Sequence, residues 1–290
     1  MGVAGGLGIG KVLFSLFSRG SAKTKMFLVI GVIIAMFVFK FNPLSLLGMG
    51  SPTNNQNASS ANTEQRGRSA PNDEHQAFIK AVLGANEDVW KKEFTKAYGV
   101  RYKPARCIIY SQRTRLGDGN MADAGMGPFY YPADSTIYLD PTFFTEMETR
   151  FGADGDFARA YVIAHEFGHH LQHLLGRTTN LHKMHGKVKK TDYNKASVRL
   201  ELHADFLAGV FAHHDEKNFN SLERGDIQEA MKAAKAIGDD RLQKQAGGRV
   251  QPDHFTHGTS EQRARWFMAG YRSGRPRDGE RIYTMDYYDL

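Results

Sequence analysis

The sequence contains a single cysteine, Cys107, among its 290 residues. One cysteine excludes an intrachain disulfide framework and every zinc module built from several cysteines, such as a finger or ribbon. Nine prolines and thirty glycines are too few for a proline-rich or collagenous fibre. With 41% apolar and 24% charged residues, the composition is that of a globular protein, long enough for one large domain or two small ones.

The sequence also lacks a nucleic-acid-binding motif, although its net charge is +7. Such a charge would suit an anionic partner, but the basic residues are spread along the chain and do not alternate with aromatic residues. We therefore expect a solvated basic surface and no nucleic-acid partner. Residues 177–195 are locally basic and resemble a binding patch or a second metal site, but a solvated, mobile connection between two helices is the favoured interpretation. The basic side chains there are Arg177, His182, Lys183, His185, Lys187, Lys189 and Lys190.

One long apolar run stands out, at residues 26–39. A helix of that length reaches only about 21 Å, less than the ~30 Å hydrocarbon core of a bilayer. Extension to residues 22–41 gives twenty residues, and the lysines at both ends can snorkel to the interface. The basic flanks, the N-terminal position and the polar segment that follows favour an uncleaved membrane anchor over a buried core helix. No A-x-A-like cleavage site follows the run, which argues against a signal peptide.

Charge then predicts the orientation of this anchor. Four basic residues precede the span, whereas only Lys40 follows it before Arg66. Because positive residues stay on the cytoplasmic side, we expect a cytoplasmic N-terminus and a folded domain across the membrane. The segment after the span is rich in serine, asparagine and glutamine and reads as a flexible tether. The predicted parts are a leader (1–21), a transmembrane anchor (22–47), a polar linker (48–76) and a folded domain (77–290).

The folded part is predicted to be α+β and helix-dominated. A capping box, Thr259 with Gln262, marks the start of the last helix, which runs toward Gly270. The remaining predicted elements are a helix at 78–98, short strands at 105–111 and 136–140, a glycine-rich loop at 117–127, a short helix at 141–150, and helices at 156–175, 194–214 and 224–237.

The chemistry is concentrated in the segment HEFGH (165–169), an H-E-x-x-H pattern on a predicted helix. His165 and His169 lie one turn apart on one face, so both imidazoles can reach one zinc ion, and Glu166 can accept a proton from a water on that ion. The alternative, a pair of core histidines, is disfavoured because the apolar lead-in predicts a buried helix in which such polar groups would be costly.

A catalytic zinc site needs a third protein ligand. His173 lies on the same stripe but about 12 Å along the axis from His165, too far to converge on one ion. The longer H-E-x-x-H-x-x-G-x-x-H pattern is absent, because residues 171 and 175 are leucines. The predicted helix at 194–214 instead places Glu201 and Asp205 on one apolar face. Glu201 would bind zinc and Asp205 would orient a ligating imidazole, unless both acids are simply solvated or cap neighbouring groups.

On these residues the chain resembles a known family, the bacterial neutral zinc metallopeptidases (YpfJ-like zinc peptidases). The resemblance implies a zincin-like domain behind a membrane-spanning N-terminus. Together with the orientation predicted from charge, we expect a single-pass protein of the bacterial inner membrane, with its catalytic domain periplasmic or extracellular. The E-x-x-A-D segment from Glu201 to Asp205 is also similar to the third-ligand motif of gluzincin peptidases. This similarity implies that Glu201 is a zinc ligand and that Asp205 supports a ligating residue without binding the ion itself. The matching segments are 126–140, 155–176, 201–214 and 255–267, within residues 77–272.

One departure from this family concerns cysteines. Family members often have cysteines near positions 118 and 131 and after the A-D pair, where this chain has Asp118, Tyr131 and Phe206. A disulfide suggested by those positions is absent, so packing must supply any stability that it gives the relatives.

Two further site predictions rest on weaker patterns. His257, before the last helix, would stabilise an oxyanion, although it would serve equally as a structural turn residue. The strand containing Ile137, Tyr138 and Leu139 would be the edge on which an extended peptide lies.

Together these patterns predict a membrane-anchored zinc metallopeptidase with one catalytic Zn²⁺, held by His165, His169 and Glu201. Glu166 would be the general base. Peptides or proteins would be its substrates, and the lipid bilayer would contact its N-terminal helix. The alternative is a catalytically inactive, zinc-stabilised membrane scaffold that binds partners. Glu166 argues against this alternative, because a purely structural site has no use for an acid beside an open coordination position.

Overall fold

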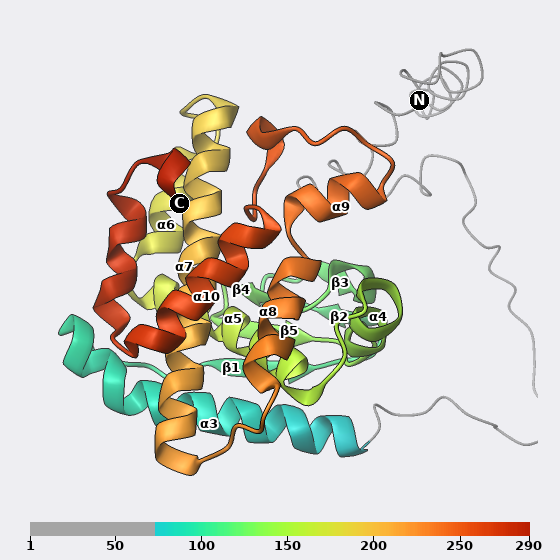
Figure 1. Ribbon diagram of the computed structural model, residues 1–290, viewed down its shortest axis with the longest axis vertical. Helices are drawn as coiled ribbons and strands as arrows, with labels where there is room; N and C mark the ends of the chain where they lie inside the picture. Colours follow the sequence, from blue (N-terminus) through green and yellow to red (C-terminus); the bar gives the residue numbers. More distant parts are fainter. Residues whose placement is uncertain (1–72) are drawn as a thin grey trace, which may run out of the picture. The chain divides into compact units, whose positions relative to one another are not determined.

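A computed structural model describes residues 73–290 of the chain (Figure 1). The predicted leader and membrane anchor, and the linker as far as residue 72, lie outside these residues. Within residues 73–290, no helix is both long and apolar enough to cross a bilayer. The first helix begins at Asp73, four residues before the domain start predicted at 77.

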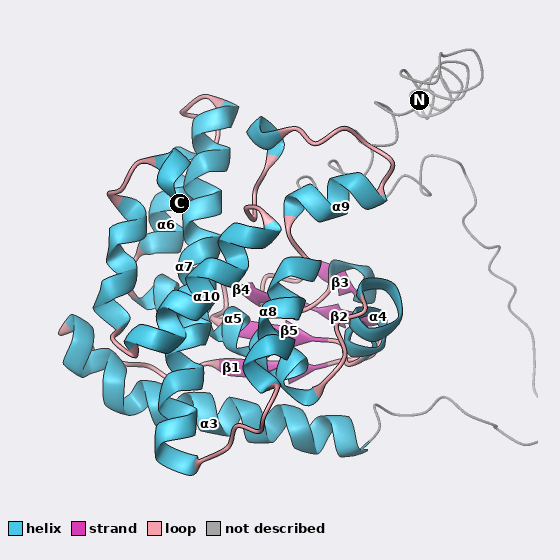
Figure 2. Ribbon diagram, in the orientation of Figure 1, coloured by secondary structure: helices cyan, strands magenta, loops and turns pink. Residues whose placement is uncertain are grey.

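The described part is a helix-dominated α+β fold, as the sequence predicted (Figure 2). A small sheet lies against α5, which contacts β4 and β5 (Figure 1). The α-helices are α3 (Asp73–Tyr98), α4 (Thr142–Phe151), α5 (Asp156–Leu174), α6 (Arg177–Met184), α7 (Lys190–Phe219), α8 (Asp226–Ala236), α9 (Asp239–Gln245) and α10 (Ser260–Ser273). The strands are β1 (Arg106–Ile109), β2 (Arg113–Arg115), β3 (Met121–Asp123), β4 (Phe129–Tyr131) and β5 (Thr136–Leu139), and short 3₁₀ segments include η4 (Pro276–Tyr283).

The main sheet has the strand order β1-β5-β4, which corrects one prediction. Strand β5 pairs in parallel with β1 and antiparallel with β4, so both of its edges are occupied. Ile137, Tyr138 and Leu139 are fully buried. These residues therefore cannot form the peptide-binding edge that the sequence suggested, because a central strand has no free backbone groups to offer. The open edge nearest to α5 belongs to β4.

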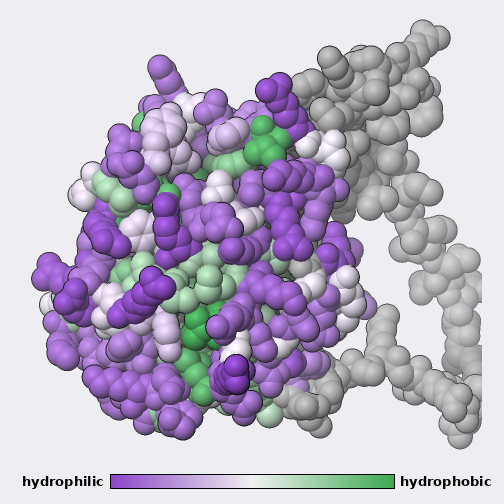
Figure 3. Space-filling model, viewed as in Figure 1, coloured by the Kyte–Doolittle hydropathy of each residue, from purple (hydrophilic) through white to green (hydrophobic). Residues whose placement is uncertain are grey.

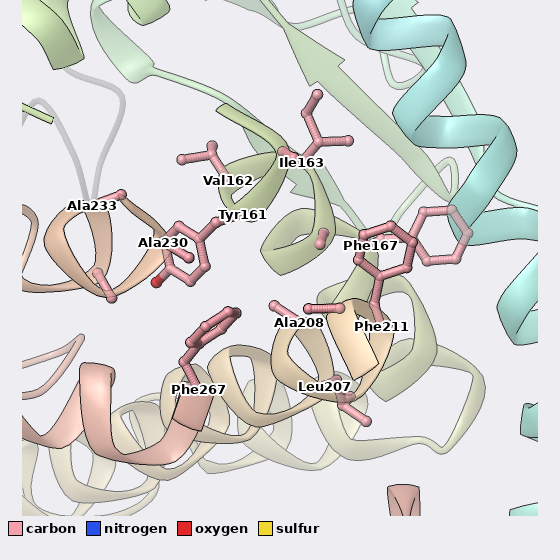
Figure 4. Close-up of a cluster of buried hydrophobic side chains, with 14 of the residues drawn as sticks. Tyr161, Val162, Ile163, Phe167, Leu207, Ala208, Phe211, Ala230, Ala233 and Phe267 are labelled. Atoms are coloured by element: carbon pink, nitrogen blue, oxygen red, sulfur yellow. The ribbon is translucent and has the colours of Figure 1, made fainter. Parts of the chain in front are cut away.

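The core lies between α5, α7, α8 and α10 (Figure 4). Tyr161 and Phe167 of α5 meet Ala208 of α7, Ala230 of α8 and Phe267 of α10 in this cluster. Each helix presents an apolar face to it, as the helical spacing of apolar residues requires. Burial of these side chains fixes α5 and α7 side by side, which is the arrangement on which the site depends.

Helices α7 and α10 approach until their backbones touch. A Cβ atom on Gly270 of α10 would lie 1.9 Å from the Phe206 carbonyl oxygen of α7. Only glycine fits at such a distance, so this residue sets how closely the two helices pack. Phe206 is itself fully buried and contacts Trp266 edge-on.

Two segments differ from their predictions. The glycine-rich stretch at 117–127 is not wholly loop, because it contains β3, which pairs antiparallel with the preceding β2 in a small hairpin. Asp118 in this hairpin accepts a hydrogen bond from the Tyr131 hydroxyl, so the two positions discussed above are in contact. The basic segment at 177–195 was interpreted as a mobile connection, but it contains α6 and the first turns of α7. Its Arg177 is tied to Glu280 by an ion pair.

The close contact of α7 with α10 makes Gly270→Ala a test of the packing. We expect the variant to lose about 2–3 kcal/mol of unfolding free energy in urea, because the added methyl group forces the two backbones apart. Gly84→Ala in α3 is the matched control, since its Cβ would meet no atom within 4 Å. That change should be neutral or stabilising by up to ~1 kcal/mol. Equal stability of both variants would show that the helix contact is looser than described.

Candidate metal centre

Helix α5 supplies the first two groups of the site, His165 and His169. The helix is buried over most of its length, and the two imidazoles lie one turn apart. Their ring centroids are 4.8 Å apart and their planes are almost perpendicular, at 86°. Gly168 lies between them, where a Cβ would be 3.1 Å from the Ala204 Cα atom of α7. This small residue therefore lets α7 approach the face of α5 that presents the histidines.

Helix α7 supplies the third group, Glu201. One carboxylate oxygen lies 3.2 Å from His165 Nε2 and the other lies 3.5 Å from His169 Nε2. One potential ligand atom from each residue lies within 4.8 Å of the other two. Ligand atoms at about 2.0–2.1 Å from a tetrahedral zinc are about 3.4 Å apart, so the donor set and its spacing fit zinc with one position open. The prediction that these three side chains come together is confirmed.

His165 is oriented by a buried ion pair behind it. Its Nδ1 atom lies 2.8 Å from Asp205 Oδ1, which leaves Nε2 directed at Glu201. Arg263 of α10 donates to both oxygens of Asp205, at 2.9 and 3.0 Å, and the Tyr161 hydroxyl donates to the same carboxylate at 2.5 Å. The predicted supporting role of Asp205 matches this geometry. A carboxylate behind a ligating imidazole fixes its tautomer and raises its basicity.

The charges of this cluster are strongly coupled. Burial raises the pKa of Asp205, but the Arg263 charge and then His165 outweigh it and lower this pKa to about 2. Burial likewise raises the pKa of Glu201, but His169 and the hydrogen bonds from both histidines hold it well below its usual range. The lowered pKa values favour the ionised form of both carboxylates, and an ionised carboxylate removed from water requires a nearby cation. Arg263 serves Asp205, and Glu201 faces the space between the two imidazoles.

Glu166 lies beside this group but outside it. Its side chain is buried, and one oxygen accepts a hydrogen bond of 2.8 Å from the Tyr130 backbone N–H on β4. Burial raises the pKa of Glu166, although the charges of His169 and His165 act in the opposite direction. The carboxyl group is thus held in place by the sheet and made more basic by its surroundings. A general base needs both properties.

His257 is close to the site but differently supported. Its side chain is half exposed, at 48%, and its Nδ1 atom lies 3.1 Å from Asp239 Oδ1. Asp239 also accepts the His257 backbone N–H, at 2.7 Å. Partial burial lowers the pKa of His257, but the Asp239 hydrogen bond and the Glu201 charge raise it above its usual value. The role of His257 as an oxyanion donor stays a prediction.

Other candidates do not join the metal group within residues 73–290. His173 contacts Thr178, and His213 contacts the Tyr271 carbonyl oxygen. Burial raises the pKa of Cys107 to about 12, so this thiol stays protonated and is a poor ligand. A groove of about 760 Å³ is lined by α3, the start of α5 and the end of α7, and its lining does not include His165, His169 or Glu201. Apolar surface on the face shown in Figure 3 is confined to small areas among hydrophilic side chains.

Sequence reasoning missed several supporting residues. Arg263 and Tyr161 act on Asp205 from helices that are distant in sequence, and no short-range pattern links them. The Tyr130 amide acts through its backbone, which leaves no trace in residue type. The contact of Gln172 with His169 could have been predicted from the sequence, because residues three apart on a helix are neighbours.

Comparison with known proteins agrees with this site. Residues 2–281 match a family described as "putative neutral zinc metallopeptidase". The chain is 43% identical to the uncharacterized protein YpfJ of Escherichia coli K12 over 247 residues, which is 84% of this chain and 83% of that protein. It is 42% identical to the uncharacterized protein Rv2575 of Mycobacterium tuberculosis H37Rv over 213 residues, or 69% and 68% of the two chains. No solved structure matches it.

The fold and the three-ligand group define a helix-rich protein with a site suited to zinc. The family match covers nearly the whole chain. The chain belongs to this zinc metallopeptidase family.

Removal of single ligands tests the metal centre. The purified protein should bind one zinc ion, and His165→Ala, His169→Ala and Glu201→Ala should each lose it, as measured by metal analysis after gel filtration. Asp205→Asn should weaken affinity only about 10–100-fold, because it supports a ligand without binding the ion. His185→Ala, an exposed histidine, is the control and should keep full occupancy. Full occupancy with unchanged coordination in Glu201→Ala would reject this assignment and return attention to His173, His203 and His213.

Proposed function

We propose that the protein is a zinc-dependent metallopeptidase that hydrolyses peptide bonds, anchored to the membrane by its N-terminal segment. One observation carries the proposal. Glu166 is buried next to the three-ligand group, is oriented by the Tyr130 amide, and has no structural ion-pair partner among those found in residues 73–290. A buried acid at that place is explained by proton transfer to and from a reacting water.

The mechanism assigns distinct tasks to the side chains. A zinc ion held by His165, His169 and Glu201 would polarise the scissile carbonyl and lower the pKa of a water toward neutrality. Glu166 accepts a proton from the attacking water and later delivers it to the leaving amine. The Tyr130 N–H keeps the Glu166 carboxylate directed at its task, since it fixes one of the two oxygens.

The open edge of β4 supports a peptide as substrate. Tyr130 on this strand lies opposite Ile137 of β5, and its N–H points to Glu166 instead of to β5. The free side of β4 therefore faces the site. An extended peptide that adds to such an edge gains main-chain hydrogen bonds regardless of its sequence. This arrangement would bring the scissile bond close to Glu166.

A non-catalytic, zinc-stabilised scaffold is the competing function. Structural zinc sites are closed by four protein ligands, whereas the group described here offers three. A scaffold would also have no need for Glu166. The three-ligand geometry and the buried acid together favour the enzyme.

Glu166→Gln separates the two functions. The variant should keep zinc while peptide hydrolysis falls about 10²–10⁴-fold, because the amide preserves shape but cannot accept the proton. Glu146→Gln, at an exposed position on α4 whose carboxylate pairs with Arg150, is the control and should keep full activity. His257→Ala in the same assay should lower kcat more than it raises KM if His257 stabilises the oxyanion.

Two outcomes would count against the enzyme. A zinc-loaded wild type without Glu166-dependent cleavage of any peptide in a diverse library would indicate a scaffold. Cleavage that survives Glu166→Gln at the wild-type rate would assign the base elsewhere.

We also propose that residues 22–47 anchor the protein with its N-terminus in the cytoplasm, because basic residues precede this apolar segment. Alkaline phosphatase fused after residue 60 should be active, since that enzyme works only outside the cytoplasm. A matched fusion to β-galactosidase should be inactive. The reverse pattern of activities, with both fusions in the membrane fraction, would overturn the orientation. The reverse pattern with both fusions in the soluble fraction would overturn the anchor itself.

A further inference from the structure

The second histidine ligand, His169, is supported by an amide instead of a carboxylate. Its Nδ1 atom lies 2.9 Å from Gln172 Oε1. The Gln172 amide is fully buried, and its nitrogen donates to the Leu200 carbonyl oxygen at 2.6 Å. A carbonyl can only accept, so this contact fixes which end of the amide faces His169. His169 must therefore carry its proton on Nδ1 and direct Nε2 toward Glu201.

The same amide nitrogen reaches a second buried histidine, His203 on α7. Gln172 Nε2 lies 3.3 Å from His203 Nδ1, and the Tyr283 hydroxyl lies 3.0 Å from the same atom. Because an amide nitrogen can only donate, His203 Nδ1 is an acceptor and the ring proton lies on Nε2.

The far side of His203 faces an acid. Its Nε2 atom lies 3.9 Å from Glu280 Oε1, and neither atom has a hydrogen-bond partner. The other oxygen of Glu280 is held by the Arg177 guanidinium, which also lies over the Tyr283 ring at 4.7 Å. The Nε2 atom and the Glu280 oxygen are thus two buried, unpaired polar atoms next to each other, beyond hydrogen-bond distance, and the negative charge of the carboxylate favours a proton on Nε2.

We propose that Glu280, His203 and Gln172 form a positioning chain that holds His169 in its metal-binding tautomer. The donors all point in one direction, from His169 to Gln172, from Gln172 to His203 and from His203 toward Glu280. The chain links the metal centre to η4, which follows α10 in the C-terminal part. The proposal rests on the metal site described above, and it assigns no contact with substrate to these residues.

The chain makes the two histidine ligands unequal. His165 is supported directly by the Asp205 carboxylate, whereas His169 reaches its carboxylate only through an amide and a second imidazole. Loss of an outer partner of a ligand typically weakens metal affinity about 10–100-fold. The effect should be largest at Gln172 and should fall with each step toward Glu280.

The test is zinc affinity, measured on the full-length protein by competition with a chromophoric chelator. Gln172→Leu should weaken zinc binding about 10–100-fold, and Glu280→Gln should weaken it less. In the Gln172→Leu background, Glu280→Gln should have no further effect, because the chain is already broken. Tyr283→Phe removes only a hydroxyl donor and should change affinity slightly, with Tyr287→Phe from the same C-terminal region as its matched control.

Two further measurements separate positioning from folding. Thermal unfolding of the metal-free variants reports their stability, and the cobalt-substituted proteins report ligand geometry through their visible spectra. His203→Phe should shift that spectrum, while His203→Gln, which keeps an acceptor and a donor, should restore it. If Gln172→Leu does not fold, the spectra of His203→Phe and His203→Gln and the zinc affinity of Glu280→Gln still test the positioning chain.

The outcomes distinguish this proposal from the proposed function. A wild type that binds no zinc would reject both. A wild type that binds zinc and cleaves peptides, with Gln172→Leu, His203→Phe and Glu280→Gln all within twofold of its affinity, would reject the chain alone. Additive effects of Gln172→Leu and Glu280→Gln would also reject it, because independent residues do not act through one another.

Discussion

Two carboxylates, the fully buried Asp205 and the partly buried Glu201, lie one turn apart on α7, and the rest of the site is arranged around them. An unpaired buried carboxylate costs several kcal/mol, so each must find a cation. Asp205 pairs with Arg263 of α10 and also contacts His165 of α5. These contacts join α5, α7 and α10 behind His165. Within residues 73–290, the ion-pair partners found for Glu201 are the imidazoles of His165 and His169, and a divalent ion would complete its surroundings.

This constraint explains the tight packing of the helices. Arg263 can reach Asp205 only because α10 lies directly against α7, a contact that Gly270 makes possible. Glu201 can reach both imidazoles only because α7 lies against α5. The positions of the donor atoms are therefore fixed by a core of apolar side chains before any ion binds. Such preorganisation is the condition for a site that performs chemistry.

The sequence predicted what short-range spacing can encode. Two histidines in one H-E-x-x-H turn, and two acids four residues apart, specify faces of single helices, and their convergence is confirmed. The edge-strand role of Ile137 was wrong, because strand order depends on pairing between distant segments. Arg263 and the Tyr130 amide were missed for the same reason. Their roles exist only after α10 and β4 have packed against α5 and α7.

The central claim is that zinc is bound by two imidazoles and one carboxylate, with a position left open. X-ray absorption at the zinc edge of the loaded protein measures this directly. The account predicts two imidazole nitrogens at about 2.0–2.1 Å and oxygen ligands at about 2.0–2.2 Å, with a change in the oxygen shell when a hydroxamate inhibitor is added. A closed shell of four protein ligands that does not respond to the inhibitor, or a sulfur ligand, would contradict it.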